Sequence, residues 1–156
     1  MQANEATIRR FYTAFQNKDS AEMGRCYDEN IVFSDPVFGW LEGEEVRKMW
    51  EMLCKRGKDL TISIGKIDLL DEEYATCEWE ARYVFTGTGN PVVNKVKAHM
   101  RLRDGLITEH TDAFDLYRWC RQALGWKGWL LGWTNFLHKR VQRQALASLE
   151  KYMSNF

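Results

Sequence analysis

Asp35 is the residue whose type and position most clearly suggest chemistry. It ends a short run of β-branched and aromatic residues at positions 31–35, and Pro36, which has no amide for a strand ladder, follows it. A carboxylate at such a strand end loses hydration under an apolar cover, so its pKa rises and it becomes a better base toward a carbon-bound proton. An aspartate before proline can equally do no more than cap the loop. Both interpretations of Asp35 stay open.

His110 and Asp112 form a second candidate pair near the end of the chain's central part. On a strand the two share one face, and the carboxylate can orient the imidazole and make it more basic, which suits proton transfer near pH 7. Regular alternation argues against an inward direction, because an inward Ile107 would also turn Glu109 and Thr111 inward. We therefore expect the pair on the outer face. A β-bulge, which would reverse this, is the alternative.

The other chemically capable residues indicate neither a metal nor a cofactor. Only three histidines are present, and the four cysteines stand far apart without a zinc-ligand spacing, at Cys26, Cys54, Cys77 and Cys120. We expect reduced, mostly buried thiols. His99 alternates with apolar residues and should face away from any pocket, whereas His138 lies in a basic segment and should be solvated. Phosphate-binding glycine loops and nucleophile elbows are missing from the sequence.

Size and charge limit the classes of protein that need to be considered. A chain of 156 residues with 45% hydrophobic residues is expected to build one core. The 22 basic and 22 acidic residues cancel, so no global field attracts nucleic acid, and we expect no such partner. No apolar run reaches the roughly 20 residues of a transmembrane helix, and positions 1–10 lack a signal-peptide core. These features predict a cytoplasmic protein.

The elements that must position these residues can be read from hydrophobic periodicity. Apolar residues at intervals of three and four predict helices at 5–18, 42–55 and 137–152, and Asp19 can cap a short second helix that reaches Tyr27. Alternation of apolar and polar residues predicts one-sided antiparallel strands at 60–64, 75–85, 96–102 and 107–116. Turn residues at 71–73, 87–91 and 103–105 predict that consecutive strands form hairpins.

The last part of the chain is locally basic and rich in tryptophan. No acidic residue occurs between Asp115 and Glu150, whereas six lysines or arginines do, and the tryptophans stand at Trp119, Trp126, Trp129 and Trp133. Such a segment can lie on a membrane surface or bind a partner. The segment also contains Gly125, Gly128 and Gly132, and glycines permit close backbone approach. We therefore favour a helical flap that closes the domain, or a dimer interface, over these two alternatives.

Several local strings match members of one protein family. They are Phe11-Tyr12-Thr13-Ala14-Phe15 with Lys18-Asp19, then Val32-Phe33-Ser34-Asp35-Pro36-Val37, and then Arg103-Asp104-Gly105-Leu106-Ile107 with Glu109-His110 and Phe114-Asp115. On these strings, and on the order of its elements, the chain resembles the SnoaL-like, ketosteroid-isomerase-related proteins of the NTF2-like superfamily. The strings at 116–125 and 131–134 resemble an uncharacterised bacterial subfamily. The resemblance implies an α+β cone at 1–117, whose helices cover a curved sheet and an apolar pocket, and a helical C-terminal extension at 118–156 packed on the same domain.

The resemblance also implies roles for individual residues. Asp35 matches the segment that carries the general base of ketosteroid isomerases, and polyketide cyclases place acid/base residues near His110 and Asp112. Phe11 and Ala98 stand where the tyrosine and acid that polarise a steroid are expected, so steroid isomerisation by that route is not expected. The predicted ligand-binding wall consists of Phe11, Tyr12, Phe15, Trp40, Trp79, Tyr83 and Met100. A closed core would explain the same residue types.

The sequence and the resemblance together predict a small-molecule pocket protein, and the resemblance alone implies that it is a homodimer. If the protein is an enzyme, we expect an isomerase, cyclase or hydrolase that performs metal-free acid/base chemistry on a hydrophobic cyclic or carbonyl compound. Asp35 would be the base, assisted by His110 or Asp112. The alternative is a non-enzymatic ligand-binding or protein-interaction module.

Overall fold

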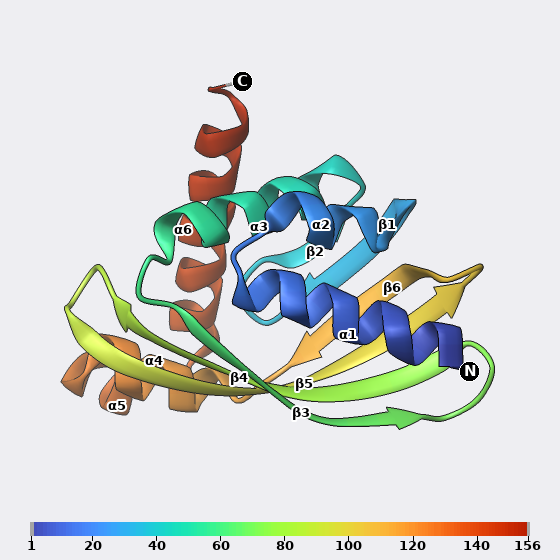
Figure 1. Ribbon diagram of the computed structural model, residues 1–156. Coiled ribbons are helices and arrows are strands. Elements are labelled where there is room, and N and C mark those ends of the chain that lie inside the picture. The colour runs from blue at the N-terminus through green and yellow to red at the C-terminus, as the bar shows by residue number, and fades with distance from the viewer. Residues whose placement is uncertain (1, 156) are drawn as a thin grey trace.

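A computed structural model describes residues 2–155 and shows an α+β fold (Figure 1). The helices are α1 (Gln2–Gln16), α2 (Ser20–Arg25), α3 (Glu44–Arg56), α4 (Leu116–Leu124), α5 (Trp126–Leu131) and α6 (Asn135–Met153). The strands are β1 (Tyr27–Asp35), β2 (Gly39–Glu42), β3 (Thr61–Leu69), β4 (Tyr74–Phe85), β5 (Asn90–Arg103) and β6 (Leu106–Ala113). Within the described range, no helix is both long and apolar enough to cross a membrane.

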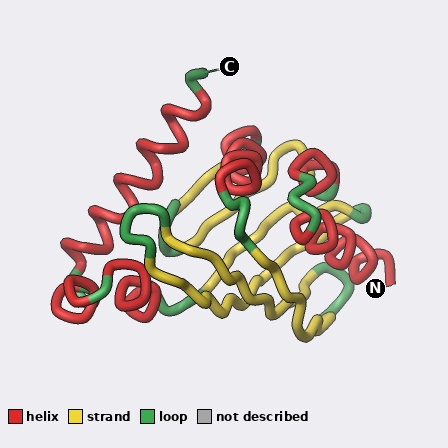
Figure 2. Tube along the Cα trace, turned by 60° about the vertical axis from the view of Figure 1, so that its left-hand side comes forward, coloured by secondary structure: helices red, strands yellow, loops and turns green. Residues whose placement is uncertain are grey.

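The described strands form one curved sheet in the order β2-β1-β6-β5-β4-β3. Neighbouring strands are antiparallel except for β1 and β6, which run parallel. Figure 2 shows most of the helices gathered on one side of the sheet, with the C-terminal helix rising along one end. The sheet and these helices enclose the main apolar core. This arrangement is the curved sheet with covering helices that the sequence predicts.

The helix predictions hold with changes at the ends. The apolar stripe of α1 is buried, including Ile8 and Phe11, and the Asp19 side chain caps α2 by accepting from the Glu22 amide. The predicted second helix is too long, because Cys26 is already its C-cap and Tyr27 begins a strand. The first strand therefore has four residues more than predicted, and these bring the Tyr27 side chain into the core.

Several strand predictions also need correction. Strand β3 continues to Leu69, and β6 ends at Ala113 because Leu116 already begins α4. The short strand β2 was not predicted, because four residues are too few for a periodic pattern to stand out in the sequence. Strand β5 begins at Asn90, so the turn predicted at 87–91 is shorter, and Pro91 pairs with Val84 in the sheet. Long pairing between β4 and β5 builds the curved floor beneath the helices.

The C-terminal helices pack on this sheet and on α3. A second apolar cluster joins α4 to β5 through Val92, Leu116 and Trp119, among others. Helix α5 packs on α4, and Leu149 of α6 is buried in the main core. The first and last helices of this segment therefore pack on the sheet and on α3, whereas the main packing partner of α5 is α4.

Candidate functional site

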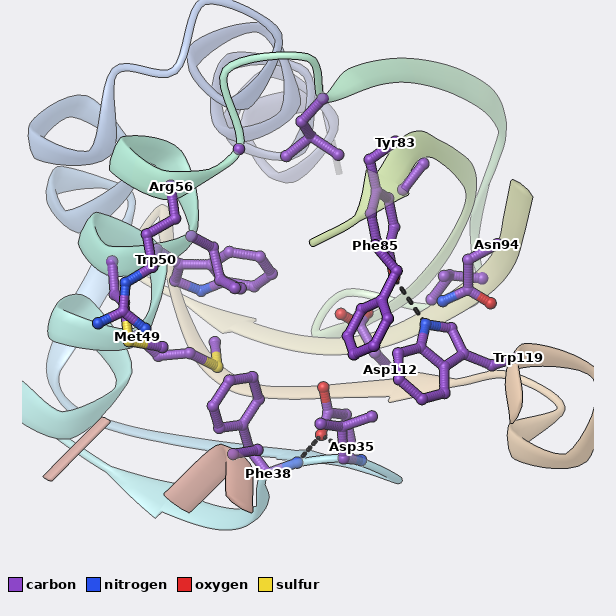
Figure 3. Close-up of a pocket in the computed structure, with 18 of the residues that line it drawn as sticks. Asp35, Phe38, Met49, Trp50, Arg56, Tyr83, Phe85, Asn94, Asp112 and Trp119 are labelled. Carbon is purple, nitrogen blue, oxygen red and sulfur yellow. Dashed lines mark hydrogen bonds between the residues drawn. The ribbon is translucent and has the colours of Figure 1, made fainter. Parts of the chain in front are cut away.

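A cavity of about 350 Å³ lies between α3, the ends of β4 and β5, and helices α4 and α6. Its wall is mostly apolar and aromatic, with Phe15, Met49, Trp50, Trp79, Phe85 and Trp119 among the lining residues. Asp35 and Asp112 also line it, and Figure 3 shows both carboxyl groups facing this cavity. An apolar pocket with a few converging polar groups is the usual form of a small-molecule site.

Asp35 both caps the loop and lines the cavity, so its two sequence interpretations apply together. Its Oδ1 accepts from the amides of Val37, at 2.9 Å, and Phe38, at 2.5 Å. Burial raises the pKa of the Asp35 carboxyl from 3.8 to about 7, although those two amides act in the opposite direction and the nearby Asp112 adds to the rise. The group is therefore poised between acid and base at neutral pH.

A β-bulge turns His110 and Asp112 inward, so the expectation of an outer-face position is wrong. On β5 the adjacent residues Arg101 and Leu102 pair with Glu109 and Ile107, which leaves Thr108 as an extra residue on β6. The Thr108 hydroxyl donates to the Arg101 carbonyl at 3.2 Å. Beyond the bulge the side chains alternate the other way, and His110 and Asp112 are only 1% and 4% exposed.

A buried chain of hydrogen bonds fixes the direction of His110. Trp50 Nε1 can only donate, so the Tyr27 oxygen accepts from it at 2.9 Å. The Tyr27 hydroxyl then donates to His110 Nδ1 at 2.7 Å. This leaves the ring proton on His110 Nε2, which donates to Asp112 Oδ1 at 2.8 Å, and every group in the chain has a partner. Trp79 Nε1 approaches the same oxygen at 3.4 Å.

Asp35 and Asp112 are therefore held in the same way. In each, Oδ1 accepts hydrogen bonds from the protein, whereas no described residue bonds Oδ2. The held oxygen fixes the orientation of the carboxyl group, and the other oxygen can contact a bound molecule. Two carboxyl groups on one apolar cavity can divide acid and base roles when their environments differ.

His110 lies behind Asp112 and does not line the cavity. It touches the aromatic rings of Phe33 and Trp50 instead. The geometry thus makes His110 a group that orients Asp112. Neither Tyr27 nor Trp50 was singled out from the sequence, because their bond to His110 joins segments that are far apart in the chain.

The predicted wall residues fall into three groups. Phe15, Trp79 and Tyr83 line the cavity, whereas Phe11, Tyr12 and Met100 are buried behind it in the core. The placement of Trp40 in the wall is wrong, because Trp40 lies on β2 with 65% of its surface exposed and donates to Glu42. Alternation on this short strand turns Leu41 inward and Trp40 outward.

The C-terminal segment supplies residues of the cavity wall that were not predicted from the sequence. Trp119 of α4 lines the cavity, and its Nε1 donates to the Tyr83 hydroxyl at 2.6 Å (Figure 3). Because the Tyr83 oxygen accepts this bond, its own hydrogen is available to a bound molecule. Burial raises the Tyr83 pKa, so the hydroxyl remains protonated near neutral pH. Asn94 adds an amide to the same wall.

The remaining candidate groups lie outside this cavity. The four cysteines are free and buried, and no described set of three or more His, Cys, Asp or Glu residues could hold a metal ion. His99 is exposed, as predicted from its register. His138 is half-buried, contrary to the prediction, because its Nε2 donates to the Gly132 carbonyl at the start of α6.

Residues 8–110 match the family model of the SnoaL-like domain. The chain belongs to the SnoaL-like family. This match covers more than half of the chain, and solved structures of NTF2-like proteins share its fold. The SnoaL-like match ends before Asp112 and before the C-terminal helices. No curated protein matches the chain in sequence.

Several solved structures are similar in fold to this SnoaL-like protein. A putative SnoaL-like polyketide cyclase from Jannaschia sp. CCS1 has 13% identity and a TM-score of 0.69, covering 80% of this chain and 93% of that one. An LEH-like epoxide hydrolase from M. tuberculosis has 19% identity and a TM-score of 0.67, covering 83% and 93%. A protein with a ketosteroid isomerase-like fold from Catenulispora acidiphila, in complex with trimethylamine, has 16% identity and a TM-score of 0.66, covering 75% and 91%. At these identities the likeness shows the fold alone.

Proposed function

We propose that this SnoaL-like protein catalyses metal-free acid/base conversion of a hydrophobic cyclic or carbonyl compound. The observation that supports this is the pair of carboxyl groups, Asp35 and Asp112, held on one apolar cavity with one unclaimed oxygen each. Isomerisation, cyclisation and hydrolysis each need a proton to be taken from one atom and given to another. Similar folds named as a polyketide cyclase and an epoxide hydrolase are consistent with such chemistry.

Asp35 is the proposed base. Its pKa of about 7 leaves a useful fraction ionised at neutral pH, yet makes the carboxylate more basic than an exposed aspartate. Its free Oδ2 would take the proton from the substrate, while Oδ1 stays bonded to the loop amides of Val37 and Phe38.

Asp112 is proposed to exchange the second proton, with His110 as its positioning residue. The His110 Nε2–H bond fixes the carboxyl group, and the tyrosine and tryptophan behind it fix the imidazole. Tyr83 is the proposed donor to a substrate carbonyl, because its hydrogen is free while Trp119 holds its oxygen. This tyrosine would replace the donors missing at Phe11 and Ala98, both of which are fully buried.

Proton abstraction can be tested before the substrate is known. Cyclic ketones that bind the protein are incubated in D₂O, and deuterium incorporation next to the carbonyl is followed by NMR. We expect exchange that rises with pH around a midpoint near 7, matching the Asp35 pKa. Asp35→Asn should slow exchange about 100-fold or more with little loss of ligand affinity.

Asp71→Asn is a matched control for this experiment, since Asp71 also accepts two backbone amides but lies on a distant turn. It should leave the exchange rate unchanged. Unchanged exchange in Asp35→Asn would refute the assignment of the base. Binding without exchange for every bound ketone would favour the non-enzymatic ligand-binding module.

We also propose that the protein is cytoplasmic and, as the family resemblance implies, a homodimer. The outer sheet face carries oppositely charged cross-strand partners, Glu78 with Lys97 and Glu80 with Lys95, which could pair with a second copy. Light scattering at several salt concentrations tests the subunit count. A monomer at all concentrations would contradict the proposal.

A further inference from the structure

Helix α5 and the start of α6 expose an unusually large set of apolar side chains. The exposed fractions are 69% for Trp126, 59% for Trp129, 63% for Leu130, 46% for Leu131, 69% for Trp133 and 66% for Phe136. We call these six residues the aromatic surface. They all lie within residues 126–136 and hold three of the seven tryptophans. Single exposed apolar residues are common on protein surfaces, whereas a group of this size usually marks an interaction site.

The packing of α5 explains why these large side chains face outward. Gly128 and Gly132 are buried against α4, and a Cβ at Gly128 would lie 2.0 Å from the Cys120 carbonyl oxygen. A Cβ at Gly132 would lie 2.9 Å from the Tyr117 ring. The helix therefore turns its smallest residues inward and its aromatic residues outward. An ordinary amphipathic helix buries its large apolar side chains against the core, whereas α5 exposes them.

The charged residues of the segment that carries the aromatic surface are all of one sign. The segment between Asp115 and Glu150 contains six lysines or arginines and no acidic residue, in a chain whose net charge is zero. Lys127, Lys139 and Arg140 are exposed. The Arg121 guanidinium stacks over the rings of Tyr117 and Trp129 at 4.7 and 4.6 Å, which adds a cation beside the aromatic surface.

We propose that the aromatic surface docks the protein on an anionic lipid bilayer. Exposed tryptophan and leucine can enter the boundary between headgroups and acyl chains, while the neighbouring lysines and arginines reach lipid phosphates and anionic headgroups. The helix lies along the membrane plane and does not span it. The absence of acidic side chains from this segment fits an anionic lipid surface, because such a surface attracts lysine and arginine and would repel aspartate and glutamate.

Vesicle co-sedimentation of the full chain tests this. One set of vesicles contains phosphatidylcholine alone, and the other contains roughly one third phosphatidylserine. We expect the wild-type protein to sediment with the anionic vesicles, to bind the neutral ones far more weakly, and to be released as salt screens the charges. Trp126→Ala with Leu130→Ala should weaken binding about tenfold or more, because less apolar surface enters the bilayer.

Trp40→Ala is the matched control, because Trp40 is equally exposed at 65% but lies on β2 outside the aromatic surface. It should bind vesicles like the wild type, and circular dichroism should show that all variants fold. Equal binding by the double variant, or equal binding to both kinds of vesicle, would overturn the proposal. So would a wild-type protein that binds neither vesicle but forms a multimer that the double variant dissociates, since the surface would then pair two copies of this chain.

Discussion

His110 Nε2 and Asp112 Oδ1 lie 2.8 Å apart on the inner face of β6, next to the cavity. This contact depends on the extra residue Thr108, which reverses the alternation of the strand. The bond orients the Asp112 carboxyl group, and Tyr27 and Trp50 fix the imidazole from the other side. The chemistry proposed for the cavity therefore rests on a buried network with no exposed member.

Removing the hydroxyl of Tyr27 should destabilise the fold. Tyr27→Phe leaves His110 Nδ1 and Trp50 Nε1 without their partner in a dry site, so we expect a loss of about 2–4 kcal/mol in the free energy of unfolding. Urea unfolding measures this. Tyr74→Phe, at a tyrosine that is 42% exposed, should change stability by less than about 0.5 kcal/mol. Equal effects of the two variants would contradict the network.

Asp35→Asn should change stability in a pH-dependent way. The folded state raises the Asp35 pKa from 3.8 to about 7, so protonated Asp35 contributes stability that is complete below pH 4 and lost as the pH rises through 7. Asparagine keeps an acceptor for the loop amides and cannot ionise. The free energy of unfolding of the variant, relative to that of the wild type, should therefore rise by on the order of 2–4 kcal/mol between pH 4 and pH 8.

Unfolding in urea at several pH values measures this gain, and Asp71→Asn provides a control of opposite sign. Asp71 accepts two backbone amides in the same pattern, but on the surface, and those bonds lower its pKa. Its contribution is present above its ordinary pKa and lost in acid. Asp71→Asn should therefore lose stability relative to the wild type as the pH rises. A pH-independent difference for Asp35→Asn would contradict the raised pKa.

Much of the fold can be predicted from the sequence because periodicity reports which face of an element is buried. The alternation of β4 and the apolar stripe of α1 both survive in the structure. The end of β1 at Asp35 could also be anticipated, since Pro36 has no amide to continue the strand ladder. The capping bond from Asp19 follows from local rules as well.

The candidate site is harder to predict because its decisive features are not local. Thr108 carries no residue-type signal for a bulge, so the inward turn of His110 could not be read from alternation. The partnership of His110 with Tyr27 joins residues 83 positions apart. Trp40 was misplaced because residue type alone suggested a pocket, although Leu41 is the buried neighbour on that strand.

The four cysteines should be almost inert in the native protein. Burial raises the pKa of Cys54 and Cys120 to about 11 and that of Cys77 to about 12, and it also raises that of Cys26. Because the thiolate is the reactive form, a thiol reagent at pH 8 should react at least about 100-fold more slowly than with free cysteine. Spectrophotometric titration should detect four thiols only after denaturation. Rapid reaction of any thiol in native buffer would contradict this burial.

Gly128→Ala should detach α5 from α4. The added Cβ would meet backbone atoms of Cys120 and Arg121 at 2.0 to 2.8 Å, and these cannot rotate away. We expect a net loss of about 1–3 kcal/mol and faster hydrogen exchange in α5, even though alanine favours helices. Gly24→Ala is the control, since its Cβ would meet only the flexible Arg47 side chain at 3.6 Å, and it should be neutral or stabilising by up to about 1 kcal/mol. Equal behaviour of the two variants would contradict the close packing of Gly128 on α4. The outward direction of the α5 aromatic side chains would then have no explanation in that packing.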